Sequence, residues 1–378
     1  MIAVGRDFGW SRTIISTMPL ITGMTAALLS PLYGGLMDRI GSRRVLLPGL
    51  IGYAAALMAI SIVPQVTWLF FAIYLALGIL VGSQAPAGYN KVICQWFVRS
   101  RGAAMAIVAA TSASVGYALM PQVANYLVVH YDWRTAYFCL GMAILLLSFP
   151  INYWFLRERH GPSVNIGKAI DAPPADEGMT QSHGQKTLSF WKLWISLFLA
   201  ANIYYGVMLH LFPMMLDRGI DRFTATSAIS AIAIGAVGGQ LAAAALLDRV
   251  NTPKIGMLFF LIGFCGVLQI HLGTSPTEFR IGAIMVGVGQ GAELSVIAYI
   301  TSRLFGLRAF GGLCSMIYAG AAVATGTGPL IMGYCYDRFG SYRAAFLAGE
   351  IGLIVALLLI FTLPPYVFGG KTSQAKSV

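Results

Sequence analysis

The stretch Gly34-Gly35-Leu36-Met37-Asp38-Arg39-Ile40-Gly41-Ser42-Arg43-Arg44 separates two long apolar runs with a short, basic turn. Gly34 lets two helices approach closely because it has no side chain. Gly41 permits a tight turn with positive φ, and Asp38 at a helix end can pair with a basic residue or with the N-terminus of a neighbouring helix. Three arginines can hold this loop and face anionic lipid, namely Arg39, Arg43 and Arg44. The stretch therefore predicts two membrane helices joined by a charged loop.

The composition of the whole chain agrees with a lipid environment. Of 378 residues, 57% are hydrophobic and 10% are charged, whereas a soluble domain carries roughly 25% charged residues. So few charges cannot cover a water-soluble surface, and much of this surface must face lipid. The net charge of +11 comes from short basic clusters between apolar runs, which membrane topology produces. We therefore expect membrane lipids and no nucleic acid among the partners.

Apolar runs long enough to cross a bilayer recur along the chain. A helix needs about 20 apolar residues to span the hydrocarbon core, and continuous rather than alternating hydrophobicity argues against spanning strands. We expect about eleven transmembrane helices, at residues 11–33, 45–63, 68–89, 103–127, 135–156, 191–215, 225–247, 255–272, 279–302, 311–334 and 343–363. The fold class predicted from the sequence is an all-α membrane protein.

Lysines and arginines are distributed unevenly between the two sides of this topology. Of the 25, 17 lie on one side and 8 on the other, so the positive-inside rule places the first side in the cytoplasm and the protein in the cytoplasmic (inner) membrane. The C-terminus lies on that side. The expected parts are an N-terminal bundle at 1–156, a cytoplasmic linker at 157–190, a C-terminal bundle at 191–363 and a cytoplasmic tail at 364–378.

The two halves of the chain carry the same markers at a nearly constant offset. Asp38-Arg39 and Asp248-Arg249 lie 210 residues apart, and Arg134 and Arg343 lie 209 apart within similar aromatic stretches. Two further pairs are Gly102 with Gly311 and Pro121 with Pro329. A constant offset indicates an internal duplication, which is how many secondary transporters are built.

The duplication also predicts that the first half is one helix short. The span at 191–215 opens the second half, and its counterpart would precede residue 1. The residues Val4 to Ser11 then correspond to the outer loop that should follow this missing helix. We expect an N-terminally shortened version of a twelve-helix transporter, through a start codon assigned too late or through loss of the helix.

The stretch 34–44 closely resembles the loop motif of the major facilitator superfamily, Gly-x-Leu-Ala-Asp-Arg-x-Gly-Arg-Arg. A degraded second copy runs from Ala244 to Lys254, with Asn251 in place of the turn glycine. The resemblance implies the major facilitator fold of two pseudo-symmetric helical bundles. It also implies a gating motif made of Gly34, Asp38, Arg39, Gly41, Arg43, Arg44, Asp248 and Arg249.

Other stretches resemble the bacterial branch related to monocarboxylate carriers and oxalate–formate antiporters. They include residues 8–12, 95–102, 291–293, 302–308 and 336–342. This resemblance implies transport of a small organic anion such as a monocarboxylate, often coupled to protons, by alternating access. Members of the branch often carry an acidic–basic pair in the span that corresponds to 225–247, and this span has no such pair. We expect a monomer without a cofactor.

Polar groups inside the predicted spans are the candidates for solute binding or coupling. Inserting an ionisable residue into the middle of a membrane helix costs on the order of 2.5–3.5 kcal/mol by insertion scales. Because of this cost, such a residue is usually present for a functional reason. Glu293 lies mid-span, its repeat counterpart is Gln84, and His210 can titrate near neutral pH. Further candidates for the solute path are Asn202, Tyr205, Tyr89, Asn90, Tyr299 and Tyr318. The alternative for each is a structural hydrogen bond between helices.

Signatures of catalysis are missing from the sequence. It has no phosphate-binding loop, no cluster with metal-ligand spacing and no Gly-x-Ser-x-Gly elbow, so we expect no enzyme. Two alternatives to organic-anion transport remain. One is efflux of a drug or metabolite, although Tyr74 stands four residues before Gly78, where proton-linked drug antiporters usually carry an arginine. The other is a membrane sensor or assembly protein that does not transport.

Overall fold

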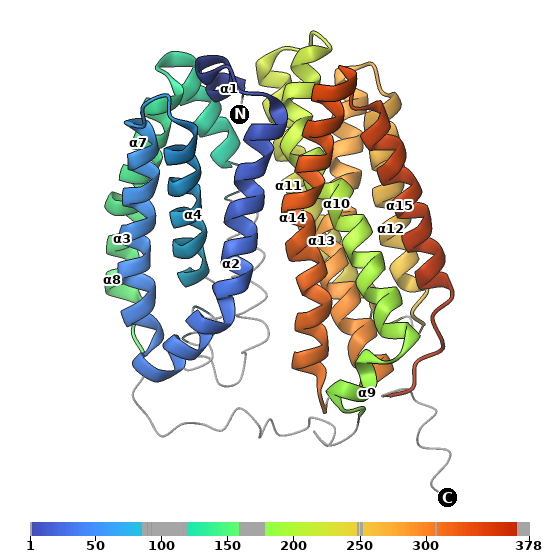
Figure 1. The fold of residues 1–378 in the computed structure, drawn as a ribbon. Coiled ribbons are helices and arrows are strands. Elements are labelled where there is room, and N and C mark those ends of the chain that lie inside the picture. Colours follow the sequence, from blue (N-terminus) through green and yellow to red (C-terminus); the bar gives the residue numbers. More distant parts are fainter. Residues whose placement is uncertain are drawn as a thin grey trace, which may run out of the picture. The chain divides into compact units, whose positions relative to one another are not determined.

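The computed structural model describes residues 2–84, 89, 92, 116, 119–158, 178–247, 249, 252–306 and 308–368. The regular elements in these ranges are helices, with one isolated bridge between Gly178 and Gly306. The chain divides into two compact units, Met1–Pro162 and Ser163–Val378. Each unit is a helical bundle (Figure 1).

Within its described residues, unit 1 contains a short first helix, four long helical segments and the helical residues 119–130. The first helix and the four long segments are α1 (Ile2–Phe8), α2 (Arg12–Ile40), α3 (Ser42–Ser61), α4 (Thr67–Ser83) and a continuous helix formed by α7 (Trp133–Ala143), η1 (Ile144–Ser148) and α8 (Phe149–Phe155). Helix α2 packs on α4, and α3 packs on α7. The segment η1 is a single π turn, in which the N–H of Phe149 donates to the carbonyl oxygen of Ile144 five residues earlier.

In the part of unit 2 that the structure describes, six long helices and one short one form a bundle. They are α9 (Gln181–Gln185), α10 (Leu188–Asp217), α11 (Arg222–Leu247), α12 (Ile255–Leu272), α13 (Pro276–Phe305), α14 (Phe310–Phe339) and α15 (Arg343–Phe361). Helix α10 packs against α11, α14 and α15, and α13 packs against α11 and α12. The buried apolar residues of these helices form one continuous core.

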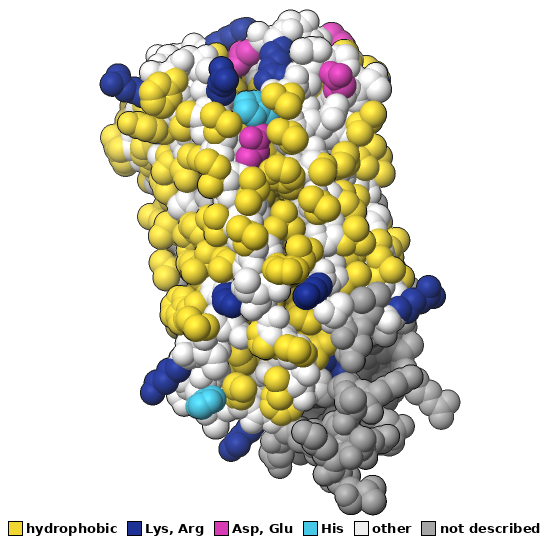
Figure 2. All heavy atoms as spheres, turned by 90° about the vertical axis from the view of Figure 1, so that its right-hand side faces the viewer, with side chains coloured by type: hydrophobic (Ala, Val, Ile, Leu, Met, Phe, Trp, Pro, Cys, Tyr) yellow, Lys and Arg dark blue, Asp and Glu magenta, His cyan; other side chains and the backbone are white. Residues whose placement is uncertain are grey.

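The described helices have the lengths and surfaces of membrane spans. Nine of those within the described ranges are long and apolar enough to cross a membrane. Figure 2 shows one face of unit 2, where hydrophobic side chains cover the middle and most lysines and arginines lie toward the two ends. Ile351 and Leu358 of α15 are 61% and 58% exposed. Such an apolar surface is unusual for a protein in water and expected in lipid, so the chain is a multi-pass membrane protein.

The predicted spans and the observed helices agree closely in unit 2 and differ at the start of unit 1. Residues Val4 to Ser11 were expected to form a loop, but α1 occupies Ile2–Phe8 and a turn follows it. With the 210-residue offset, Ile2–Phe8 corresponds to 212–218, which contains the last turns of α10. The segment therefore matches the end of a helix rather than a loop. Most of the predicted span 103–127 lies outside the described residues, and residues 119–130 are helical.

Residues 178–187, which the sequence assigns to the linker, belong to unit 2 and pack against its long helices. The N–H of Met179 donates to the carbonyl oxygen of Phe305 at 2.8 Å. The side-chain amide of Gln185 donates to the sulfur of Met316 at 2.8 Å. Gly184 lies against the side chain of Leu313. These contacts fix the entry of the chain into α10.

Equivalent contacts recur in the two units. The hydroxyl of Ser11 accepts the N–H of Ile14 at the start of α2, and the carboxylate of Asp221 accepts the N–H of Thr224 at the start of α11, 210 residues later. Gly78 of α4 lies against the backbone of Thr22, just as Gly287 of α13 lies against the backbone of Ile232. The α2–α4 crossing of unit 1 is therefore repeated by α11 and α13 in unit 2.

Candidate solute and proton site

Glu293 lies in the middle of α13 and is buried inside unit 2. The residue is 1% exposed, and neither carboxyl oxygen has a hydrogen-bond partner within the part of the chain that the structure describes. An ionised carboxylate buried without a partner is very costly, and such groups take up a proton instead. The surroundings of Glu293 therefore suit a neutral carboxylic acid, which becomes negatively charged only when it releases its proton.

Tyr204 of α10 reaches the same region from a neighbouring helix. Its side chain is 0% exposed, and its hydroxyl has no partner among the described residues. A Cβ at Gly263 of α12 would lie 2.0 Å from this hydroxyl oxygen, and one at Gly289 of α13 would lie 2.7 Å from it. The two glycines thus form a slot that holds the hydroxyl, here called the Tyr204 slot. The hydroxyl also lies within electrostatic range of Glu293.

Tyr318 of α14 approaches Glu293 from a further side. Its hydroxyl donates to the carbonyl oxygen of Leu294 at 2.7 Å, one residue beyond Glu293, and it lies within electrostatic range of the carboxyl group. The structure therefore brings together two residues that the sequence singled out, Glu293 and Tyr318. It adds Tyr204, which sequence reasoning missed in favour of its neighbour Tyr205. The only sequence signal for Tyr204 is a pair of glycines on two other helices.

His210 is buried at a different place in unit 2. It is 1% exposed, and both ring nitrogens are engaged. The Nε2 atom lies 3.0 Å from the carbonyl oxygen of Pro329, which can only accept, so Nε2 carries the proton. The Nδ1 atom, 3.1 Å from the hydroxyl of Tyr342, then accepts from that group. In this arrangement His210 joins α10 to α14 and to the residue before α15.

The other predicted polar candidates are spread over several sites. Asn202 donates to the carbonyl oxygen of Phe198 at 3.0 Å and accepts from the hydroxyl of Thr327 at 2.9 Å. Tyr299 accepts from Arg303 at 3.0 Å, one turn along α13. Tyr205 is half-buried on α10. All three residues belong to unit 2, and the hydrogen bonds described here do not join them to Glu293.

Gln84 and Tyr89 form their own small network in unit 1. The amide nitrogen of Gln84 donates to the carbonyl oxygen of Leu46 at 3.0 Å. Its amide oxygen accepts from the hydroxyl of Tyr89 at 3.1 Å. Gln84 and its repeat counterpart Glu293 thus differ, because Gln84 is hydrogen-bonded and Glu293 is not. Asn90 lies outside the described residues.

The loop motif forms a compact turn between α2 and α3. Gly41 has φ of 95°, which confirms the predicted positive φ. The Glu158 carboxylate accepts the N–H of Ser42 at the start of α3, and its oxygens occupy the space where a side chain at Gly41 would lie. Arg43 donates to the carbonyl oxygens of Tyr153 and Leu156, at 2.7 and 3.2 Å. The end of α8 therefore holds the turn.

A basic cavity lies beside this turn. Its volume is about 600 Å³, and its lining includes Arg39, Arg44 and Arg157 together with Glu158. Arg249 of the second copy is exposed. Asp248, the surroundings of Gly34 and the side chain of Asp38 are not among the described parts of the chain.

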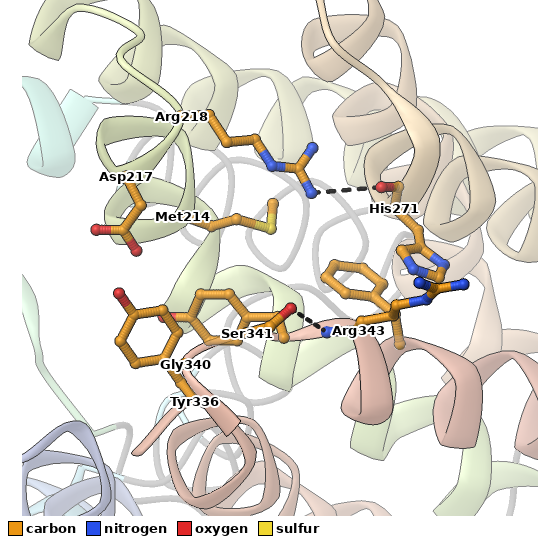
Figure 3. Close-up of a pocket in the computed structure, with 10 residues that line it drawn as sticks. Met214, Asp217, Arg218, His271, Tyr336, Gly340, Ser341 and Arg343 are labelled. Atoms are coloured by element: carbon orange, nitrogen blue, oxygen red, sulfur yellow. Dashed lines mark hydrogen bonds between the residues drawn. The ribbon is translucent and has the colours of Figure 1, made fainter. Parts of the chain in front are cut away.

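A second cavity of about 310 Å³ lies between α10, α12 and the turn from α14 to α15 (Figure 3). Arg218 donates to the backbone oxygens of Gly273 and His271, at 2.7 and 3.3 Å. The His271 ring in turn lies 2.7 Å from the carboxylate of Glu350. Arg218 and His271 thus hold the ends of α10, α12 and α15 together, and this cluster is separate from Glu293.

Sequence comparison finds relatives of this chain that are named for different kinds of solute. Residues 1–291 match the model of the Major Facilitator Superfamily. The multidrug resistance protein MdtG of Klebsiella pneumoniae (strain 342) is 25% identical over 347 residues, covering 89% of this chain and 79% of that protein. Monocarboxylate transporter 13 of Bos taurus is 24% identical, covering 92% and 80%.

Two further comparisons add another named transporter and a solved fold. A gallate transporter of Pseudomonas putida is 21% identical, covering 86% of this chain and 81% of that protein. Among solved structures, a bacterial homologue of the human lysosomal transporter Spinster, in an inward-facing and unoccupied conformation, has a TM-score of 0.66. It is 16% identical and covers 95% of this chain and 90% of its own, so the likeness concerns the fold alone.

Proposed function

Since this chain belongs to the Major Facilitator Superfamily, we propose that it is a secondary active transporter that moves a small organic anion together with protons. Several of its relatives are named as transporters, and the family works without chemistry on its solute. The proposed mode is alternating access, with no cofactor and no covalent step. The proposed location is the inner membrane, with the C-terminus in the cytoplasm because most lysines and arginines lie on that side of the predicted topology.

The observation that carries the proton coupling is the buried Glu293. A carboxyl group with two unbonded oxygens in the middle of a membrane helix is stable when protonated and costly when ionised. A group of this kind binds and releases a proton when its surroundings change during a transport cycle. Glu293 is the proposed coupling residue.

The proposed solute class is a carboxylate. Two of the relatives are named for such solutes, a monocarboxylate transporter and a gallate transporter. Asn202 and Tyr205 are half-buried polar residues of α10 and are proposed to contact the solute. The turn around Gly41, held by Arg43 and Glu158, is proposed to act as part of the gate.

A second candidate function is efflux of a drug or hydrophobic metabolite. The observation that favours it is the likeness to MdtG, which is named as a multidrug resistance protein. Tyr74, at the position where proton-linked drug antiporters usually have an arginine, argues against this alternative. The hydroxyl of Tyr74 lies 2.8 Å from that of Tyr137, so the position is occupied by a neutral pair.

Reconstitution in liposomes tests the proposal. The expected result is accumulation of radiolabelled lactate or gallate that depends on an inward-directed proton gradient and is abolished by a protonophore. Glu293→Gln should remove accumulation while leaving exchange of solute across the membrane. Glu278→Gln is the matched control, because it makes the same change in the same helix at a capping-box position. Proton-driven transport of a lipophilic dye instead of the carboxylates would favour the second candidate, and a folded protein without any flux would favour a sensor or assembly role.

A further inference from the structure

We propose that Tyr204 is the positioning partner of Glu293, and that its hydroxyl donates a hydrogen bond to the Glu293 carboxylate whenever that group has released its proton. The two residues then form one buried proton site inside unit 2. The role of this site in coupling rests on the proposed function. The pairing itself rests only on the geometry of α10, α12 and α13.

The direction of the Glu293 side chain supports the pairing. Long side chains on an α-helix lean toward its N-terminus and cover the position four residues earlier. On α13 that position is Gly289, whose missing side chain leaves room for the Tyr204 hydroxyl. This general lean favours a Glu293 carboxyl group that extends toward the oxygen lying over Gly289, and in the structure the two groups are not hydrogen-bonded to each other.

The Tyr204 slot determines where the hydroxyl can lie. A Cβ at either Gly263 or Gly289 would come closer to the oxygen than 3 Å, so any other residue at these positions would displace it. Two glycines on two helices thus hold the hydroxyl within a core of large apolar side chains. A phenylalanine at position 204 would pack equally well there, so packing alone does not account for the hydroxyl.

The hydrogen-bond inventory of this region points to the same pair. Three buried polar atoms lack a partner here, the two oxygens of Glu293 and the hydroxyl oxygen of Tyr204. Buried polar groups are nearly always hydrogen-bonded. A tyrosine hydroxyl is a donor, and an ionised carboxylate is purely an acceptor, so the two groups satisfy each other once Glu293 is ionised.

Of the two tyrosine hydroxyls within electrostatic range of Glu293, that of Tyr204 has no hydrogen-bond partner within the described residues. On α13 itself, the side-chain amide of Gln290, one turn before Glu293, donates to the sulfur of Met208 at 3.8 Å. From α14 come Tyr318, whose hydroxyl already donates to the backbone of Leu294, and Cys314, which lies beside Tyr318. No lysine, arginine or histidine pairs with Glu293 within the described part of the chain.

The proton balance of the site is simple. Glu293 releases its proton to water, the O–H bond of its carboxyl group breaks, and the resulting carboxylate accepts a hydrogen bond from Tyr204. Tyr204 keeps its own proton throughout. Reprotonation from water reverses the step. Tyr204 therefore tunes the proton affinity of Glu293 without carrying the proton itself.

Infrared spectroscopy of the purified protein tests the pair without any need for a known solute. A protonated-carboxyl band that is lost in Glu293→Gln identifies the Glu293 signal, and a pH titration gives its midpoint. A hydrogen bond to a charged group contributes about 1.5–3 kcal/mol, so Tyr204→Phe should raise this midpoint by about one to two pH units. Tyr137→Phe, which removes a hydroxyl from the Tyr74 pair in unit 1, should leave the midpoint unchanged.

A second variant covers the case in which Tyr204→Phe does not fold. Gly289→Ala retains the tyrosine but displaces its hydroxyl from the slot, and it should raise the same midpoint. An unchanged midpoint in the folded Tyr204→Phe or Gly289→Ala protein overturns the pairing, as does a Glu293→Gln protein that loses no carboxyl band.

Transport measurements then separate this pairing from the proposed function. If the wild type takes up lactate or gallate, the pH profile of uptake in Tyr204→Phe should shift upward together with the infrared midpoint. If the wild type moves neither solute but the midpoint still shifts, the pair stands and organic-anion transport fails.

Discussion

Gly287 of α13 lies directly against the carbonyl oxygen of Ile232 in α11, where a Cβ would be only 2.1 Å from that oxygen. The contact is one of four between the same helices. A Cβ added at Gly235, Gly239 or Gly291 would likewise lie 2.0–2.2 Å from a backbone oxygen of the opposite helix. Small residues let membrane helices approach this closely, and the crossing of α11 and α13 depends on them.

Replacing Gly287 by alanine should therefore separate α11 from α13. Overpacking of a tight contact costs about 1–3 kcal/mol, and we expect the apparent unfolding temperature in detergent to fall. Gly238→Ala is the matched control, because a Cβ at this position on α11 meets nothing within 4 Å. Equal unfolding temperatures for the two variants would show that the helices can move apart at no cost.

Gly41→Ala should disturb the loop motif more than a backbone penalty alone. Gly41 has positive φ, and the Glu158 carboxylate fills the space beside it. A Glu158→Ala background keeps the backbone cost of Gly41→Ala and removes the carboxylate, so it isolates what Glu158 adds. We expect Gly41→Ala to lower the unfolding temperature more in the wild type than in the Glu158→Ala background. Equal falls in the two backgrounds would contradict the role of Glu158.

The stability of the α11 start should depend on pH through Asp221. Hydrogen bonds from the side chain and the backbone N–H of Thr224 hold the pKa of Asp221 below its ordinary value of 3.8. A group with a lowered folded-state pKa stabilises the fold above its unfolded pKa and loses this contribution as the pH falls through the folded value. Unfolding temperatures measured between neutral pH and pH 3 should show this loss in the wild type.

The variants of Asp221 separate charge from capping. Asp221→Asn keeps an N-cap side chain but cannot titrate. It should therefore remove the fall in unfolding temperature that acid causes through Asp221. Asp221→Ala should lower the unfolding temperature at neutral pH as well. An identical pH profile in the wild type and Asp221→Asn would mean that other carboxylates, such as Asp132 with its own lowered pKa, account for the acid sensitivity.

Tyr342→Phe should destabilise unit 2 through His210. The hydroxyl of Tyr342 is the donor for Nδ1 of the buried His210, and an unsatisfied buried acceptor costs about 1–3 kcal/mol. We expect a lower unfolding temperature for Tyr342→Phe. Tyr334→Phe, at a 58% exposed position of α14, should have no such effect. A Tyr342→Phe protein as stable as the wild type would exclude this hydrogen bond as a structural contact.

The helices and the loop turn could be predicted from the sequence because both depend on local chemistry. Apolar runs identify α12 at residues 255–272 to the residue, since lipid requires an unbroken hydrophobic segment. Gly41 could be identified because only glycine adopts its conformation readily. The family could be identified because this turn chemistry recurs in the motif.

The partners of the buried polar groups could not be predicted, because they depend on contacts between distant helices. His210 meets Pro329 and Tyr342, which are 119 and 132 residues away. Tyr204 and Tyr205 are adjacent and chemically identical, and only the packing of α10 shows which one faces Glu293. The hydrogen bond from Ser42 to Glu158 joins residues that are 116 positions apart. No sequence pattern between them indicates this contact.

The π turn at Ile144–Ser148 has a consequence for comparing the halves of this chain. It accommodates one more residue than an α-turn would, while α15 runs as an uninterrupted α-helix. The residues after the turn, from Phe149 onward, are therefore out of phase with their counterparts by one position. Deleting a single residue from this turn should convert it to ordinary α-helix and restore a uniform register between the two copies, so a one-residue deletion should be tolerated here.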